Sequence, residues 1–325
     1  MFYIPKEFDQ KVEEILEDIR NKNNIIYSSI SYAYKSGGKR IRPIFCFLCY
    51  ETIKNSQDNF QDIVLSSVCV EFLHTASLML DDVVDASDMR RGKPSVNAVF
   101  GNKVAVISGS YLIGMISKLI SDIGNINLIK KFSETSSLMA EGEALEFNIM
   151  IQTSYDLSKD FVFKNYFDVI NKKTASLFSL SSSIPPILYK KEDEYVQVFS
   201  KLGFLVGSAF QIKDDIIDFK PSDKTGKPSM KDLKEGKLTL PVILSENYEK
   251  IIEYVGAYKD VSDIPDEIVE RIHNLVVSGD GLKRAESYLQ NLSSQIYDFV
   301  DSNTVLRSRK KEFYDFVSFV VYRQF

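Results

Sequence analysis

The sequence is poor in residues that interrupt helices. Its 325 residues include only 9 Pro and 15 Gly, and so few helix breakers suit long helices better than many short strands. Apolar residues make up 44% of the chain, enough for a substantial core, and they recur at helical spacing almost throughout. No alternating strand pattern, repeat or low-complexity linker stands out. The sequence therefore predicts an all-α protein that folds as one domain over residues 1–325.

Histidine and cysteine are also scarce. With only His74 and His273, an H-E-x-x-H zinc site cannot form, and neither histidine lies in a recognisable nucleophile context. Cys46, Cys49 and Cys69 give no even number for a disulfide framework, and the Cys46–Cys49 spacing lacks the second pair of a metal site. We interpret the three as buried thiols of a protein in a reducing compartment.

The chain has no strong charge and no obvious targeting segment. Its net charge of -5 gives no general reason to expect nucleic-acid binding. The first ten residues lack the basic and then apolar pattern of a signal peptide, and no run of about 18 apolar residues suggests a membrane span. We therefore expect a cytoplasmic protein without a membrane span.

Helical periodicity divides the chain into long segments separated by few loops. The best candidate loops are residues 88–94 and 220–236, and each follows an aspartate-rich helix end. Loops at helix ends commonly carry function. The predicted helices cover residues 12–19, 25–34, 44–53, 62–85, 102–120, 128–151, 161–183, 196–219, 265–277, 281–300 and 305–322.

Two aspartate clusters with the pattern D-D-x-x-D mark these helix ends. They comprise residues 81–85 and 214–218. On a helix Asp81 shares a face with Asp85, and Asp214 with Asp218, so that like charges repel at the end of an apolar helix. A hard divalent cation resolves the conflict, and oxygen-only ligands favour Mg²⁺. A solvated helix end would explain one cluster alone, whereas two copies, each followed by basic residues, favour metal binding.

Several basic clusters accompany the aspartates. In the stretch GGKRIRP at 37–43, Lys39 and Arg42 flank a glycine turn that leads into a helix, a combination suited to a diphosphate. His74 lies two turns before Asp81 on about the same face; a contact with a ligand and a satisfied core position are both open. Together, the aspartate clusters and the basic side chains fit two diphosphate substrates, one bound through metal ions and one held by basic side chains alone. The other basic residues are Arg90, Arg91, Lys172, Lys173, Lys227 and Lys237.

These stretches give the sequence a specific resemblance to the trans-isoprenyl diphosphate synthase, or polyprenyl synthetase, family, and within it to medium- and long-chain synthases. They recur in family order over most of the chain. The family fold is a large helical bundle around a central cavity (the isoprenoid synthase fold), usually a homodimer, so the resemblance implies one such domain here. The matching stretches are GGKRIRP at 37–43, EFLHTASLMLDDVVDASDMRRGKPS at 71–95, KKTASLF at 172–178, GFLVGSAFQIKDDIID at 203–218 and DLKEGKLTLPVI at 232–243.

The resemblance also implies a role for individual residues. The implied activity is the magnesium-dependent condensation of isopentenyl diphosphate with an allylic diphosphate, with about three Mg²⁺ ions. Asp81, Asp85 and Asp214 match metal ligands, with Asp82, Asp215, Asp218 and Lys173 counted among the catalytic residues. Isopentenyl diphosphate would contact Lys39, Arg42, His74 and Arg91. The allylic diphosphate would contact Arg90, Lys173, Thr174, Gln211, Lys227 and Lys237.

Product length and departures from the family pattern remain separate questions. Ser77 and Ala76 lie four and five residues before Asp81, and short-chain relatives carry an aromatic residue at one of these positions, so we hypothesise a product longer than farnesyl, of six to ten isoprene units. Close helix packing would also explain both small residues.

Three positions depart from the residues that are usual in the family. They are Leu80, where many relatives have His, Met230, where Gly is usual, and Glu146, where long-chain relatives often have Gln.

Other readings stay open at this point. A short-chain synthase making geranyl, farnesyl or geranylgeranyl diphosphate is the main alternative, and a subunit of a heteromeric synthase that needs a partner is another. A class I terpene cyclase would have a different second metal motif. We expect no nucleic-acid partner, a homodimer, and a peripheral membrane contact for product release.

Overall fold

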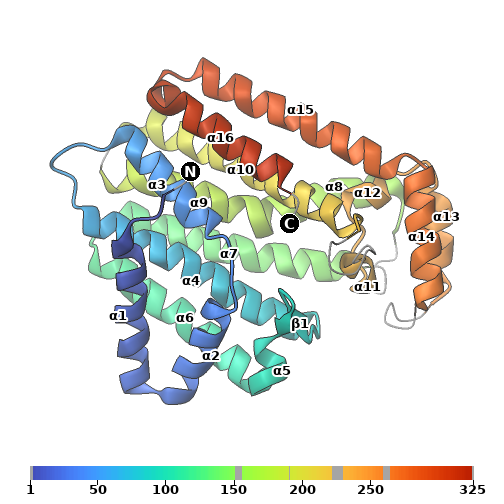
Figure 1. Ribbon diagram of the computed structural model, residues 1–325, viewed down its shortest axis with the longest axis horizontal. Helices are drawn as coiled ribbons and strands as arrows, with labels where there is room; N and C mark the ends of the chain where they lie inside the picture. The colour runs from blue at the N-terminus through green and yellow to red at the C-terminus, as the bar shows by residue number, and fades with distance from the viewer. Residues whose placement is uncertain (1–2, 151–155, 190, 222–229, 259–263, 324–325) are drawn as a thin grey trace. The chain divides into compact units, whose positions relative to one another are not determined.

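The structure is a computed structural model that describes residues 3–150, 156–189, 191–221, 230–258 and 264–323. Nearly all of its regular structure is helical (Figure 1), so the all-α prediction is confirmed. The chain divides into two compact units, which are described separately. Unit 1 comprises Met1–Met139 and Leu177–Gly203, and unit 2 comprises Ala140–Ser176 and Phe204–Phe325. The expectation of one domain stays a prediction.

Unit 1 is built around a long central helix, α4. This helix makes its largest contact with α6 and also packs against α1, α2 and α3. Its side chains are buried on almost all sides, as its uniformly apolar sequence predicted. The helices of this unit are α1 (Lys6–Lys22), α2 (Asn24–Lys35), α3 (Ile41–Ile53), α4 (Phe60–Val84), α5 (Val96–Phe100) and α6 (Asn102–Asp122), with parts of α7 (Ile126–Ile149), α9 (Ser176–Leu188) and α10 (Asp193–Asp218).

Local sequence explains where the helices of unit 1 begin. Asn23 accepts hydrogen bonds from the backbone N–H groups of Ile25 and Ile26 at 3.1 and 3.2 Å, and so caps α2. Asn59 caps α4 in the same way. Such caps satisfy helix N–H groups that have no partner within the helix. After α4 the chain forms a short antiparallel ribbon of β1 (Met89–Arg90) and β2 (Lys93–Pro94), within residues 88–94, for which the sequence predicted a loop.

Unit 2 is organised around α15, which packs against α12, α14 and α16. A Cβ atom at Gly281 would lie 2.2 Å from the Pro241 carbonyl oxygen, so only glycine allows α15 to begin this close to α12. Its elements are α8 (Lys159–Ile170), the π-helical turn η1 (Asn171–Ala175), α11 (Lys231–Lys234), α12 (Leu240–Ile243), α13 (Tyr248–Gly256), α14 (Asp266–Ser278), α15 (Gly281–Ser302), η3 (Thr304–Arg309) and α16 (Lys310–Tyr322), with the remaining parts of α7, α9 and α10.

The segment predicted as one helix over residues 161–183 differs in detail. It consists of α8, the π-helical turn η1 and α9. Helix α9 also continues to Leu188 and includes Pro185 and Pro186. A π turn adds a residue to the helix, and such turns are frequent at functional sites. The short helices α5, α11, α12 and α13 were not predicted, because four to nine residues carry little periodicity.

Two helices are long and apolar enough to pass a test for membrane spans by length and composition. The apolar window of α4 is 72% buried, so packing accounts for its character, whereas that of α6 is 33% buried. The absence of a membrane span therefore stays a prediction. Cys46, Cys49 and Cys69 are free and buried, as expected.

Candidate active site

The first aspartate cluster lies at the C-terminal end of α4 in unit 1. Asp81 and Asp85 are partly exposed, with Asp85 as the C-cap residue. The last turn contains no basic residue. Carboxylates at a helix C-terminus face the negative end of the helix dipole, at a cost of about 0.3–1 kcal/mol each. The location therefore disfavours two carboxylates and favours a cation between or beside them.

Asp82 behaves differently from its two neighbours. It is 2% exposed and accepts two hydrogen bonds from Arg90 of β1, from Nε at 2.8 Å and Nη2 at 2.5 Å. Ser95 donates to the Ser87 carbonyl at 2.8 Å and Asn97 to the same carbonyl at 3.2 Å, which fastens the ribbon to the end of α4. Asp82 thus positions Arg90, which the sequence assigned to the allylic diphosphate.

Two basic stretches that are distant in sequence meet in unit 1. Gly38 has φ +145°, and a Cβ atom there would lie 2.7 Å from Nη1 of Arg91. The glycine turn of residues 37–43 therefore packs directly against the arginine pair that follows the first aspartate cluster. Lys39 is exposed on this turn, and Arg42 is buried with its guanidinium 4.8 Å from the ring centre of Phe178.

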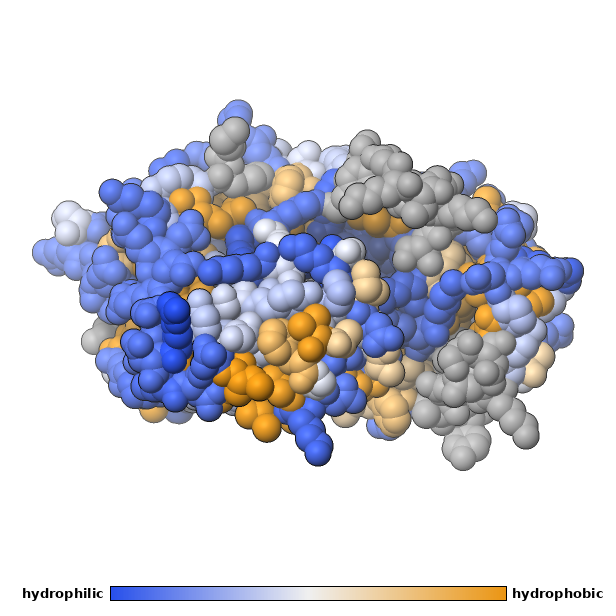
Figure 2. All heavy atoms as spheres, turned by 60° about the horizontal axis from the view of Figure 1, so that its bottom comes forward, coloured by the Kyte–Doolittle hydropathy of each residue, from blue (hydrophilic) through white to orange (hydrophobic). Residues whose placement is uncertain are grey.

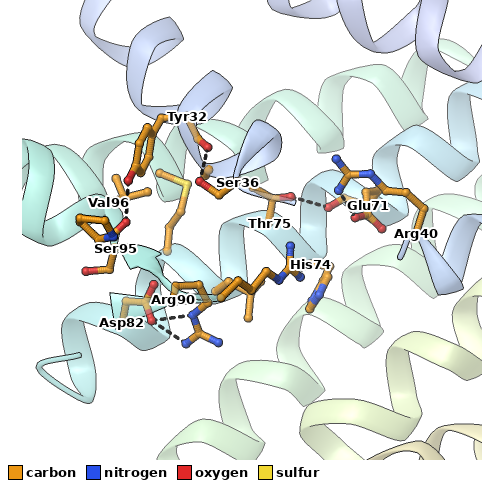
Figure 3. A pocket seen from close by; sticks show the side chains of 15 residues that line it. Tyr32, Ser36, Arg40, Glu71, His74, Thr75, Asp82, Arg90, Ser95 and Val96 are labelled. Atoms are coloured by element: carbon orange, nitrogen blue, oxygen red, sulfur yellow. Dashed lines mark hydrogen bonds and ion pairs between the residues drawn. The ribbon is translucent and has the colours of Figure 1, made fainter. Parts of the chain in front are cut away.

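His74 lies in the midst of these cations. It lines a pocket with a volume of about 450 Å³. Figure 3 shows His74 in this pocket together with Glu71, Asp82 and Arg90. Burial and the positive charges of the surrounding arginines hold the pKa of His74 well below its usual value. The imidazole is therefore neutral near pH 7 and can serve an anion as a hydrogen-bond donor. The lining also includes Arg40, Arg91 and Thr75.

Arg40 and Glu71 were not singled out from the sequence. Arg40, at φ +50°, donates to Glu71 Oε1 at 2.6 Å and to the Tyr34 carbonyl at 2.8 Å, and its guanidinium lies 3.8 Å from the Tyr34 ring centre. Glu71 is 3% exposed. These contacts hold the basic turn against α4 (Figure 3). The sequence signal was a lone acid in an apolar helix, which needs a buried partner.

The second aspartate cluster lies at the C-terminal end of α10 in unit 2. Asp215 is 1% exposed and accepts hydrogen bonds from Tyr166 Oη at 2.6 Å and Gln211 Nε2 at 2.9 Å. Burial raises the pKa of Asp215 to about 7. Thr174 Oγ1 donates to Gln211 Oε1 at 2.8 Å. The structure thus joins the predicted residues Thr174, Gln211 and Asp215 in one polar chain, and adds Tyr166, which sequence reasoning missed.

The other two aspartates of this cluster face different partners. Asp214 is partly exposed and accepts a hydrogen bond of 2.6 Å from Arg323, near the end of the chain. Asp218 accepts from the backbone N–H groups of Lys231 and Asp232 at 3.1 and 3.3 Å. Asp218 therefore holds the start of α11 against the end of α10, while its assigned role beside the metal ligand stays a prediction.

Lys173 and Lys237 lie close together in unit 2. Lys173 Nζ lies 2.5 Å from Glu146 Oε2 and also contacts Glu143, while Lys237 Nζ lies 3.7 Å from Glu146 and 2.9 Å from Glu235. Lys173 stands on the π turn η1. Lys227, the third lysine assigned to the allylic diphosphate, lies outside the described residues.

The donor set suits magnesium more than a metal held by protein alone. Within the described ranges no group of three or more His, Cys, Asp or Glu side chains is arranged to hold an ion. Mg²⁺ commonly takes one or two carboxylates, keeps several waters and completes its shell with substrate phosphates. Asp81, Asp85 and Asp214, all partly exposed carboxylates, fit that use.

Comparisons with known structures agree with this fold. The chain aligns over 97% of its length with the structure of a decaprenyl diphosphate synthase from Rhodobacter capsulatus, with a TM-score of 0.82, 27% identity and 95% of that chain covered. It also resembles the fold of a polyprenyl synthase from Caulobacter crescentus complexed with calcium and isoprenyl diphosphate, with a TM-score of 0.78, 22% identity, and 98% of each chain covered. The fold is that of the isoprenoid synthases.

Sequence comparisons specify the family. The polyprenyl synthetase family model matches residues 23–272. An all-trans-nonaprenyl-diphosphate synthase of Rhodobacter capsulatus is 37% identical over 245 residues, or 74% of this chain and 71% of that protein. A nonaprenyl diphosphate synthase of Mycobacterium tuberculosis is 30% identical over 289 residues, or 88% and 83%. The chain belongs to the polyprenyl synthetase family, as its motifs predicted.

Proposed function

We propose that this protein is a magnesium-dependent prenyltransferase that joins isopentenyl diphosphate to an allylic diphosphate in head-to-tail, 1'-4 fashion. Its product is a linear trans-polyprenyl diphosphate longer than farnesyl diphosphate. The observation that carries the proposal is the pocket of Figure 3, where the arginine pair meets the glycine turn and His74 beside an aspartate cluster. Relatives that make nonaprenyl and octaprenyl diphosphates support the length.

In this proposal isopentenyl diphosphate binds without metal in unit 1. Lys39, Arg42 and Arg91 supply positive charge, and neutral His74 supplies a hydrogen bond. Charge-assisted hydrogen bonds to a diphosphate are short and strong. Arg40 contributes indirectly, because its contacts with Glu71 and Tyr34 fix the turn that carries Lys39 and Arg42.

The remaining site residues are proposed to bind the allylic diphosphate. Asp81, Asp85 and Asp214 are the proposed ligands for about three Mg²⁺ ions, which when bound neutralise charge that develops on the departing diphosphate. Lys173 and Lys237 add positive charge, and Gln211 is oriented by Asp215 and Thr174. The same group includes Arg90, Thr174 and Lys227.

The reaction then needs no protein base. The bond between the allylic carbon and the diphosphate oxygen breaks, and the electron pair leaves with the diphosphate. The double bond of isopentenyl diphosphate attacks the resulting allylic cation and forms the new carbon–carbon bond. A proton is lost from the carbon next to the new cationic centre, and the released diphosphate accepts it. Arg90 and Lys173 stabilise that diphosphate as its charge grows.

The space for the growing chain is proposed to follow α4 toward its N-terminal end. Ser77 is partly exposed and donates to the His74 carbonyl at 3.0 Å. One turn further, Leu73 lines a largely apolar hollow of about 380 Å³ between α4, α6 and α7. Ala76, in contrast, is fully buried next to α6, where a Cβ atom at Gly109 would lie 3.5 Å from the Ala76 carbonyl oxygen. Ser77 is therefore the better candidate for limiting chain length.

The proposal includes a homodimer in the cytoplasm, with a peripheral membrane contact for product release. Between Lys103 and Lys118 the exposed residues of α6 are all apolar or small, and Val106 and Ile107 are 43% and 58% exposed. Figure 2 shows one face of the molecule, where apolar side chains gather in patches between charged ones. An uncharged helix face suits a partner surface.

Incubation of the purified chain with isopentenyl diphosphate and geranyl, farnesyl or geranylgeranyl diphosphate tests the function. We expect Mg²⁺-dependent products longer than C15, resolved by chromatography, and no product in excess EDTA. Products no longer than C20 would favour a short-chain synthase. No product with any primer would favour a subunit that requires a partner.

A further inference from the structure

Glu146 is one of the carboxylates that contact Lys173 and Lys237 in unit 2. Lys173 contacts Glu143 and Glu146, and Lys237 contacts Glu146 and Glu235. Glu146 thus contacts both lysines. All of these side chains are at least 80% buried, so the contacts are weakly screened by solvent.

The backbone brings this carboxylate to the lysines. A Cβ atom at Gly142 would lie 2.8 Å from both Lys172 Cβ and the Lys173 backbone nitrogen, and 2.9 Å from Lys173 Cγ. Only glycine lets α7 approach the π turn so closely. Glu146 follows Gly142 by one helical turn and therefore lies over the same lysine.

Glu146 remains charged in this setting. Burial disfavours its ionised form, but the positive charges of Lys173 and Lys237 outweigh burial and keep the pKa of the carboxyl below its usual value. A neutral glutamine here would keep similar size and could still accept a hydrogen bond, but it would leave both ammonium groups with less negative charge nearby.

We propose that Glu146 is a positioning residue that holds Lys173 and Lys237 between turnovers and recovers them when pyrophosphate leaves. The inference rests on the proposed function, which assigns both lysines to the allylic diphosphate. An incoming diphosphate competes with the carboxylate for the same ammonium groups. The negative charge of Glu146 therefore weakens binding of diphosphate and favours its release before the next addition.

Isothermal titration of the full-length protein with inorganic pyrophosphate and Mg²⁺, without other substrates, measures this competition. We expect Glu146→Gln to bind pyrophosphate about five- to tenfold more tightly than the wild type. Glu146→Asp, which keeps the charge, should stay closer to wild type. Glu143→Gln should also bind pyrophosphate more tightly than the wild type, because Glu143 contacts Lys173, and it keeps the test open if Glu146→Gln folds poorly.

Glu141→Gln is the matched control. Glu141 lies on the same helix and pairs with Lys172 at 2.9 Å, and it is largely exposed. Its variant should bind pyrophosphate like the wild type. Steady-state kinetics should show a lower KM for the allylic substrate in Glu146→Gln, with a lower kcat where release limits turnover.

The outcomes separate this inference from the proposed function. If the wild type makes product and binds pyrophosphate but Glu146→Gln binds it equally or more weakly, Glu146 does not compete with diphosphate and the inference is wrong. If the wild type neither binds pyrophosphate nor makes product, the proposed function fails and the inference fails with it.

Discussion

His74 illustrates how much of the site depends on the charge state of single residues. Because the folded protein holds its pKa well below the usual value, the unfolded chain binds a proton that the folded chain does not. The contribution of His74 to the free energy of unfolding is therefore fully present above the unfolded pKa of about 6.5, and it is lost as the pH decreases below that value. In the folded protein the ring stays neutral and available to donate a hydrogen bond.

Replacing His74 with glutamine should remove this pH dependence. We expect the wild type to lose about 1 kcal/mol of stability between pH 7.5 and 5.5 relative to His74→Gln, because the variant has no group that must be deprotonated on folding. Urea unfolding of both proteins at the two pH values measures the difference. His273→Gln serves as a control, and equal pH dependence in wild type and His74→Gln would contradict the prediction.

The sequence could identify the residues that face ligands better than the residues that hold them. Aspartates at spacing i and i+4 predict a shared helix face directly. In contrast, Arg40 and Glu71 are 31 residues apart, Tyr166 and Asp215 are 49 apart, and Asp214 and Arg323 are 109 apart. No local pattern pairs such residues. Only burial, which requires each buried charge to have a partner, hints that they exist.

At the level of elements, local backbone geometry explains one departure from the family pattern. Met230 precedes α11 and has φ +51°, in the left-handed region that favours glycine. Its side chain is nevertheless 3% exposed. The strain of this conformation costs a methionine about 1 kcal/mol, and burial of the side chain contributes roughly 2 kcal/mol in the opposite direction. Burial outweighs strain, so methionine is tolerated.

Two substitutions at Met230 separate strain from burial. Met230→Gly should lose about 1 kcal/mol of stability, because relief of strain offsets part of the lost burial, while Met230→Ala should lose about 2 kcal/mol or more, because it keeps the strain. Thermal or urea unfolding of both variants and the wild type gives their order of stability. Alanine is ordinarily favoured over glycine, so an alanine variant more stable than the glycine variant would show that the left-handed conformation carries no appreciable cost here.

Helix α4 offers the test of product length. Ser77→Phe should shorten the main product, because the ring would enter the path between the first aspartate cluster and the hollow at Leu73. Ser77→Ala is the control and should leave product length unchanged. Chromatography of the products with a farnesyl primer makes the comparison, and an unchanged length for Ser77→Phe would contradict the proposed path.

Ala76, the residue before Ser77, is less suitable than Ser77 for testing product length. Ala76 is fully buried beside α6, so Ala76→Phe would overpack the helix contact at a cost of roughly 1–3 kcal/mol. A change of product in that variant would not distinguish a blocked path from a shifted helix. The sequence placed both small residues correctly on α4 but could not say which one faced the neighbouring helix.

At the scale of the whole molecule, composition predicted the helical class while leaving its subdivision open. Few Pro and Gly residues and helical periodicity were enough for an all-α fold. The limits of the two compact units fall inside α7, α9 and α10, at Met139, Ser176 and Gly203. Hydrophobic periodicity continues through such a position without a change, so no linker marks it in the sequence.

The uncharged face of α6 leads to a prediction about assembly. Ile107→Glu places a charge where the wild type exposes Ile107 beside Val106, Ser110 and Gly114. If this face joins two copies, burying an unpaired carboxylate should shift the protein from dimer to monomer at micromolar concentration. Light scattering coupled to size-exclusion chromatography measures the mass of the 37.1 kDa chain and its dimer.

A matched substitution tests whether any effect is specific to α6. Val277 is an exposed apolar residue of α14, 47% exposed compared with 58% for Ile107. Val277→Glu should remain a dimer, because it adds the same charge to a different helix. A wild-type monomer would contradict the homodimer itself, while a dimer that persists in Ile107→Glu would place the subunit contact on another surface. Dissociation in Ile107→Glu alone would assign that contact to α6, since charge and residue type are otherwise matched.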